Sequence, residues 1–82
     1  MSNREKYDVA FQSTLMVAPK DLAALKYQDV EAWDSVGHMA LMAALEDAFG
    51  IELDIDDIIA FSSYQTGQKI LAKYKVVIDP AP

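Results

Sequence analysis

The sequence predicts an all-α protein, a small antiparallel four-helix bundle with a short third helix, on the basis of two observations. Apolar residues recur at intervals of three and four positions in several stretches, which is the spacing of one face of an α-helix. Residues that commonly cap helices precede these stretches, and no stretch is a convincing strand. Since the chain has 82 residues, we expect residues 1–82 to form a single domain around one core.

The first predicted helix begins at a capping box in residues 2–5, Ser-Asn-Arg-Glu. Tyr7, Phe11 and Leu15 follow at four-residue spacing and predict its buried face. We expect this helix to end before Pro19, because proline cannot continue a helix.

Residues 19–33 are mixed in character and predict a long loop that crosses the bundle. Residues 21–26 are compatible with a short helical turn. Tyr27, Val30 and Trp33 are spaced apolar residues, which we expect to anchor the loop on the core.

The second predicted helix spans residues 35–49. Asp34 is a good N-cap residue, an apolar run follows it, and Gly50 suits the left-handed position that often ends a helix. This helix is apolar on nearly all sides, so it is the best candidate for the centre of the bundle.

Two faces of this helix have to be distinguished. At about 100° per residue, Leu41, Leu45 and Phe49 share one face, which we expect to lie in the core. The other face consists of Val36, Met39 and Ala43, bordered by Glu46 and Asp47. Periodicity alone leaves open whether this other face is also core or is free to meet a partner.

Two shorter helices are predicted in the second half of the chain. Asp54 is a suitable N-cap for a short third helix that carries Ile55, Ile58 and Ile59. Residues 62–65 fit another capping box and predict the start of a fourth helix. Its inward residues are expected to be Ile70, Leu71 and Tyr74.

Three further expectations concern this half of the chain. Gly67 either weakens the fourth helix by roughly 1 kcal/mol relative to alanine or permits a neighbour to pack closely. The segment from about residue 76 is expected to fray. Asp54, Asp56 and Asp57 resemble a calcium-binding loop only in charge, because the required glycine and glutamate are missing, and we expect a solvated helix start there.

Composition limits the classes of function. The net charge is −6, which disfavours nucleic acid as a partner and favours basic proteins. The chain has no cysteine and one histidine, so we expect no disulfide and no metal site. The longest apolar stretch is too short to span a bilayer, and no signal peptide is visible, which predicts a cytoplasmic protein. We expect it to be a monomer.

Ser35 is the residue best placed for chemistry. It falls in the first turn of the second predicted helix, where its hydroxyl would face solvent beside backbone N–H groups that lack helical partners. The positive end of the helix dipole lies at the same point, so a phosphate attached to Ser35 would be favourably placed.

Two stretches resemble a known family. Asp34-Ser35-Val36 resembles the Asp-Ser-Leu motif of acyl and peptidyl carrier proteins, whose serine receives 4′-phosphopantetheine. Residues 44–51, Ala-Leu-Glu-Asp-Ala-Phe-Gly-Ile, are similar to the Ala-Leu-Glu-Glu-Glu-Phe-Gly-Ile run of that family. The tripeptide alone is a weak signal, but the two motifs at the correct distance in an acidic chain of this size are a specific one.

The resemblance implies an acyl carrier protein-like bundle and a function. A separate phosphopantetheinyl transferase would use coenzyme A and magnesium to place the arm on Ser35. The arm's thiol would then carry an acyl or aminoacyl thioester from a loading ligase to a downstream transferase or synthase of a lipid, polyketide or other secondary pathway. The carrier itself would catalyse nothing. In that family Asp34 and the face of Val36, Met39, Ala43, Glu46 and Asp47 would meet the partner enzymes.

The sequence departs from the family pattern at Gly37, His38 and Ala40, which indicates a stand-alone carrier with a dedicated enzyme set. One alternative is a non-enzymatic acidic helical module that binds a basic protein with Ser35 unmodified. Another is a hydrolase in which His38 activates Ser35. The hydrolase lacks a Gly-x-Ser-x-Gly elbow, and we expect His38 instead to pack against the crossing loop.

Overall fold

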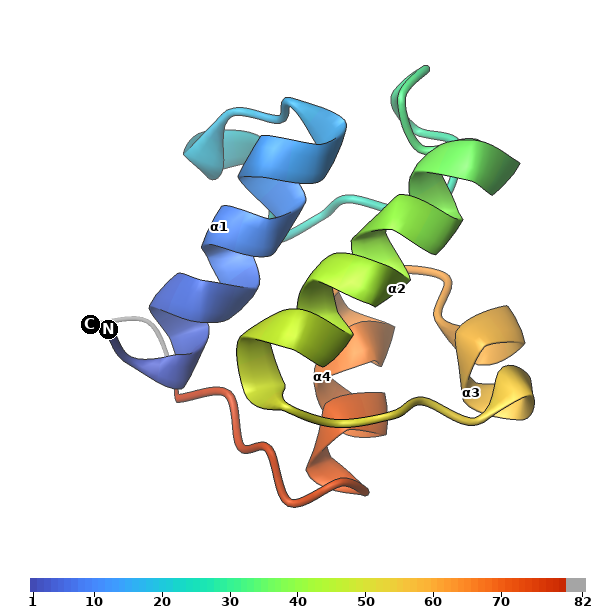
Figure 1. Ribbon diagram of the computed structural model, residues 1–82. Helices are drawn as coiled ribbons and strands as arrows, with labels where there is room; N and C mark the ends of the chain where they lie inside the picture. The colour runs from blue at the N-terminus through green and yellow to red at the C-terminus, as the bar shows by residue number, and fades with distance from the viewer. Residues whose placement is uncertain (80–82) are drawn as a thin grey trace.

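The computed structural model describes residues 1–79, which form four α-helices and one short 3-10 turn and no strand (Figure 1). The elements are α1 (Asn3–Leu15), η1 (Pro19–Asp21), α2 (Ser35–Phe49), α3 (Ile55–Ala60) and α4 (Tyr64–Ala72). The predicted all-helical class with a short third helix is therefore confirmed.

The helices do not all alternate in direction. α1 and α2 form the principal helix pair and run in opposite directions (Figure 1). Asp8 in α1 meets the first residue of α4, Tyr64, whereas Arg4 meets Asp79 beyond the end of α4. α1 is thus antiparallel to both α2 and α4, so α2 and α4 run in the same general direction. The prediction of antiparallel helices is met by α1 with α2 and by α1 with α4, but not by α2 with α4.

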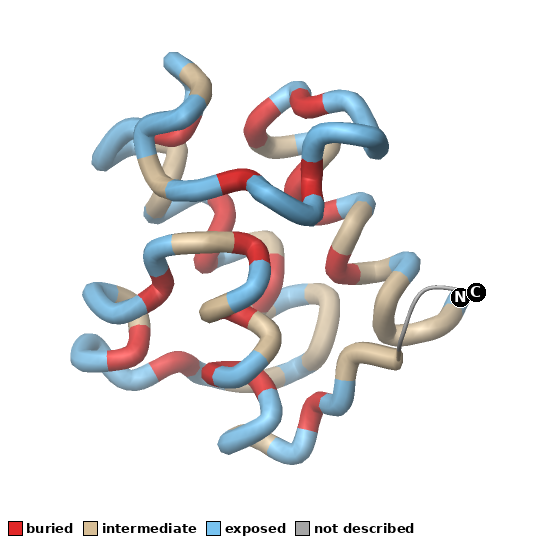
Figure 2. Tube along the Cα trace, turned by 180° about the vertical axis from the view of Figure 1, so that it is seen from behind, coloured by how far each residue is buried: buried red, intermediate tan, exposed pale blue. Residues whose placement is uncertain are grey.

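Aromatic side chains fill the centre of the bundle. Phe11 makes edge contacts with Trp33 and Tyr64, at ring-centroid distances of 5.6 and 5.3 Å. Tyr7 is also fully buried, and its hydroxyl donates to the carbonyl of Tyr64 at 2.6 Å. Figure 2 shows buried positions recurring between exposed ones along the helices, as the apolar spacing predicts.

The helix caps agree with the sequence at the first two helices. Ser2 and Glu5 form the predicted capping box, with two reciprocal bonds of 3.1 Å. The Asp34 side chain accepts from the Gly37 N–H at 2.8 Å, and Gly50 ends α2 with φ at +63°. These interactions fix where α2 begins and ends, and therefore where Ser35 lies.

The caps of the last two helices differ from the prediction. Ser63, one residue later than expected, caps α4 by accepting from the Thr66 N–H at 2.9 Å. The Asp54 side chain caps nothing at the start of α3. Ser62 instead lies in the connection between α3 and α4, where its carbonyl accepts from the Tyr27 N–H of the crossing loop.

The core face of α2 is not quite the predicted one. Leu41 and Leu45 are fully buried, but Phe49 is only partly buried because it is the last residue of the helix, at the rim of the bundle. Met42 takes its place in the core, with 1% of its surface exposed.

The crossing loop is anchored as predicted, but its helical turn lies earlier. The turn forms at Pro19–Asp21 rather than at residues 21–26, because proline is already set for the first helical position. Trp33 is fully buried, and Tyr27 and Val30 pack against the core.

Asp57 is not the solvated residue that the sequence suggested. It is buried, and its carboxylate accepts from the Lys73 ammonium and from the Tyr74 hydroxyl. These two bonds lower the pKa of Asp57 below its ordinary value, and the same pair raises the pKa of Lys73. The prediction that Tyr74 lies inward is thus met only in part, because its ring packs against the core while its hydroxyl binds Asp57.

Gly67 serves close packing. A Cβ at this position would overlap the ring of Phe61 and the hydroxyl of Tyr7. Of the two expectations for this glycine, the structure therefore selects close approach over a simple weakening of α4.

The segment after α4 is not frayed at its start. Val76 is buried, the carbonyl of Val77 accepts from the Asn3 side chain at 3.0 Å, and the Asp79 carboxylate accepts from the Arg4 N–H at 3.0 Å. The prediction of fraying from residue 76 is wrong for residues 76–79, because these residues bind the first turn of α1. Residues 80–82 lie outside the described part of the chain.

Candidate functional site

Ser35 is the first residue of α2, and its side chain is exposed. The first helical hydrogen bond runs from the His38 N–H to the Asp34 carbonyl at 2.8 Å, and Gly37 donates to the Asp34 side chain. The N–H groups of Ser35 and Val36 precede these bonds and have no helical partner. A phosphate on Ser35 would therefore have two backbone donors and the positive end of α2 beside it.

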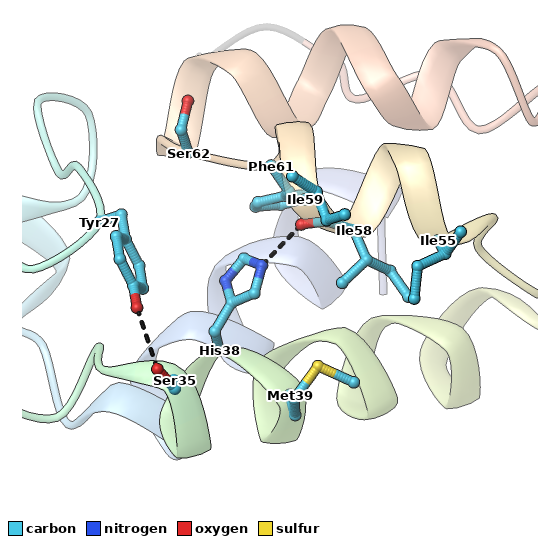
Figure 3. A pocket seen from close by; sticks show the side chains of 9 residues that line it. All are labelled: Tyr27, Ser35, His38, Met39, Ile55, Ile58, Ile59, Phe61 and Ser62. Atoms are coloured by element: carbon cyan, nitrogen blue, oxygen red, sulfur yellow. Dashed lines mark hydrogen bonds between the residues drawn. The ribbon is translucent and has the colours of Figure 1, made fainter.

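A hollow of about 380 Å³ opens beside Ser35, between the start of α2, the crossing loop and α3 (Figure 3). Its lining is mainly apolar and consists of Tyr27, Ser35, His38, Met39, Ile55, Ile58, Ile59, Phe61 and Ser62. Among residues 1–79, no lysine or arginine lines it. Its chemistry therefore suits a long, weakly polar group better than an anion alone.

His38 lines this hollow, and both of its ring nitrogens make hydrogen bonds. The indole N–H of Trp33 donates to His38 Nδ1 at 2.9 Å, which requires Nδ1 to be the acceptor. His38 Nε2 therefore carries the hydrogen and donates to the Ile58 carbonyl at 2.7 Å (Figure 3). The histidine thus ties α2 to α3.

Both nitrogens of His38 are occupied, so neither is placed to take a proton from Ser35. Within residues 1–79 no hydrogen bond joins His38 to Ser35, which removes the geometry that a Ser/His hydrolase needs. The expected packing of His38 against the crossing loop is confirmed by its ring contacts with Tyr27 and Trp33, at centroid distances of 5.6 and 6.2 Å.

Tyr27 is the residue that the sequence analysis missed at this site. It was expected to be an apolar anchor only, yet its hydroxyl lies 3.5 Å from Ser35 Oγ (Figure 3). No local sequence signal could have revealed this, because the approach depends on how the loop folds back over α2.

The second face of α2 is open. Val36 and Met39 are 78% and 53% exposed, and Ala43 is exposed as well. The hypothesis that this face belongs to the core is therefore wrong. Ile55 and Ile59 on α3 are also exposed, so the apolar surface around Ser35 extends across the hollow to a second helix.

The acidic residues predicted to flank this face differ from one another. Asp47 is exposed. Glu46 is partly buried, and its carboxylate accepts from the Leu53 N–H at 2.8 Å, which fixes the chain after α2. Asp34 is occupied as the cap of α2. Of these three carboxylates, only Asp47 projects into solvent without a structural task among the described residues.

Gly37 gives a physical reason for one departure from the carrier pattern. A Cβ at Gly37 would overlap the carbonyl of Ala32. The glycine therefore lets the crossing loop lie directly against the first turn of α2, where Trp33 and Tyr27 reach His38 and Ser35.

Within the described residues, no group of three potential metal-binding side chains lies together. No helix in that part of the chain is long and apolar enough to cross a membrane. Comparisons with protein-family models, with curated protein sequences and with solved structures found no match.

Proposed function

We propose that this protein is an acyl carrier protein whose Ser35 carries 4′-phosphopantetheine, attached from coenzyme A by a separate phosphopantetheinyl transferase. The single observation that supports this best is the setting of Ser35. Its hydroxyl is exposed at the start of a capped helix, beside the N–H groups of Ser35 and Val36, which have no helical partner, and next to an apolar hollow of about 380 Å³. An attached arm needs this combination of an accessible hydroxyl, donors for its phosphate and space for its chain.

The residues present fit such a group. Attachment requires Ser35 Oγ to give its proton to a base of the transferase and form a bond to the β-phosphorus of coenzyme A, while the pyrophosphate bond breaks and the nucleotide half leaves with its phosphate. The new phosphodiester would lie at the positive end of α2. Once bound, the arm supplies the thiol that this cysteine-free chain lacks, and that thiol holds an acyl or aminoacyl group as a thioester.

The open face of α2 would receive the partner enzymes, which are the transferase, a loading ligase and a downstream transferase or synthase. Val36, Met39 and Ala43 provide an apolar surface that leads away from Ser35, and Asp47 provides a charge at its far end. In this proposal the protein is a cytoplasmic monomer, catalyses no reaction itself and serves a lipid, polyketide or other secondary pathway.

Intact-mass measurement tests the proposal directly. The purified chain is incubated with coenzyme A, magnesium and a broad-specificity phosphopantetheinyl transferase. We expect wild type to gain the mass of one arm, and Ser35→Ala to gain none while keeping its helical circular dichroism. Ser62→Ala is the matched control, because Ser62 lines the same hollow but does not begin α2.

Two results would contradict the proposal. One is a wild-type protein that takes up no arm from any broad-specificity transferase, which would favour the alternative of an acidic interaction module with unmodified Ser35. The exposed apolar residues beside the hollow are compatible with that module as well. The other is uptake that persists in Ser35→Ala.

A further inference from the structure

We propose that Tyr27 is a positioning residue whose hydroxyl binds the phosphate of the arm on Ser35 and sets the direction in which the arm leaves the helix. This inference rests on the proposed function. It begins from the distance of 3.5 Å between the Tyr27 hydroxyl and Ser35 Oγ, both of which face the hollow (Figure 3).

This distance is at the outer limit of a direct hydrogen bond, so the pair contributes little to the unmodified protein. Esterification changes the situation. Ser35 Oγ loses its hydrogen, and a full negative charge appears on the non-bridging oxygens one phosphorus atom beyond it. A phenol placed just out of optimal range of Oγ is within reach of those oxygens. Hydrogen bonds from O–H to O⁻ are short and about twice as strong as neutral ones.

Tyr27 is held in place before any arm is attached. Its ring packs edge-on against Trp33 and His38, at centroid distances of 6.1 and 5.6 Å. Its backbone N–H donates to the Ser62 carbonyl at 2.8 Å, which ties it to the connection between α3 and α4. His38 and Trp33 are themselves joined by a hydrogen bond. The Tyr27 side chain therefore loses little further conformational entropy when its hydroxyl binds the phosphate.

The other side chains of the hollow do not offer the same donor. In the described part of the chain no lysine or arginine lines it, and the one ring N–H of His38 already donates to the Ile58 carbonyl. Ser62 lines the hollow, but within the described residues no hydrogen bond joins it to Ser35. The phosphate would thus have the N–H groups of α2 on one side and the Tyr27 hydroxyl on the other.

The test compares three proteins carrying the arm, namely wild type, Tyr27→Phe and the control Ser13→Ala, at an exposed serine of α1 that does not line the hollow. The Phe variant removes one oxygen and keeps the ring. We expect the phosphorus-31 NMR resonance of the arm in Tyr27→Phe to move toward its position in urea-unfolded protein, whereas the resonance in Ser13→Ala stays at the wild-type position. The ratio of held to free arm, measured by fluorescence anisotropy decay of a dye on the thiol, should fall by roughly tenfold to a hundredfold in Tyr27→Phe, the size of one hydrogen bond to a charged group.

A measurement on wild type alone guards against misfolding of the variant. In protein labelled at tyrosine Cζ with carbon-13, the Tyr27 resonance should shift when the arm is attached, and that of Tyr74, whose hydroxyl binds Asp57, should not. An unchanged Tyr27 resonance, or a Tyr27→Phe arm as ordered as that of wild type, would overturn the inference while leaving the carrier function intact. Failure of wild type to accept an arm would instead overturn the proposed function.

Discussion

Met39 and Met42 lie on the same helix but differ in environment, which allows one substitution to be tested against its own control. Met39 is 53% exposed beside the hollow, and Met42 is 1% exposed in the core. Full burial of a methionine stabilises a protein by about 1.5 to 3 kcal/mol, so Met39→Ala should lower the free energy of unfolding by about 1 kcal/mol, in proportion to its buried half. Met42→Ala should cost about 2 to 5 kcal/mol, because it also leaves a cavity.

The order of the two variants should be reversed for the rate of arm transfer, in which Met39→Ala should show the larger effect. Met39→Ala is expected to slow arm transfer by several-fold and at most about tenfold, the equivalent of 1.4 kcal/mol of lost apolar contact with the transferase. Met42→Ala should transfer at the wild-type rate once the rate is corrected for the folded fraction. Urea titration followed by circular dichroism gives the stabilities, and intact mass against time gives the initial rates.

Either of two outcomes would refute this reasoning. If Met39→Ala is destabilised as much as Met42→Ala, the face of α2 that holds Met39 is part of the core after all. If Met39→Ala loses only about 1 kcal/mol and still accepts the arm at the wild-type rate, the face is open but the transferase does not contact it there.

Asp47→Lys should slow arm transfer with little effect on stability, and the difference in rate from wild type should shrink as salt rises, because exposed charges act on the rate of encounter. Equal transfer rates at low salt would contradict this prediction. Glu46→Gln is unsuitable as a control, because the Glu46 carboxylate binds the Leu53 N–H. Asp57→Asn should be less stable than wild type between about pH 3.8 and 10.5 in urea titrations. Because the pKa of Asp57 is lowered by folding, the extra stability of wild type is lost as pH falls through the pKa of Asp57 in the folded protein. Because the pKa of Lys73 is raised, the extra stability is also lost as pH rises through the pKa of Lys73 in the folded protein. A stability difference independent of pH would show that the ion pair is not the source of that difference.

Local signals in the sequence were sufficient for the course of the first two helices. The box at Ser2 and Glu5, the cap at Asp34 and the glycine at residue 50 all act within a few residues, so their geometry follows from the neighbouring chain. The position of Ser35 follows from the same signals, since the cap fixes the first residue of α2.

The rest of the site depends on contacts between segments distant in sequence. His38 binds the carbonyl of Ile58, 20 residues away, and Lys73 reaches Asp57 across 16 residues. Periodicity cannot report such bonds, because it describes which face a side chain occupies and not which polar group meets it. The bond from the Tyr27 N–H to the Ser62 carbonyl, next to the serine that caps α4, is a further contact between distant segments.

Most polar side chains near the hollow bind other parts of the protein, and this affects how a partner could recognise the surface. Asp34 and His38 make hydrogen bonds that hold the start of α2, and Glu46 binds the chain that follows α2. What projects beside Ser35 is therefore mainly apolar, from Met39 across to the isoleucines of α3.

A partner that recognises this surface would gain most of its affinity by covering apolar area, with Asp47 acting at the rim. A basic patch alone would leave the apolar surface beside Ser35 uncovered, because Val36, Met39, Ile55 and Ile59 are all exposed. Asp57 is paired with the Lys73 ammonium, whereas Asp34 and Glu46 accept only from backbone N–H groups and keep their negative charge. If the proposed function holds, the partner enzymes should accordingly present an apolar contact region with basic residues at its rim, and the apolar region would distinguish them from proteins drawn to the chain by charge alone.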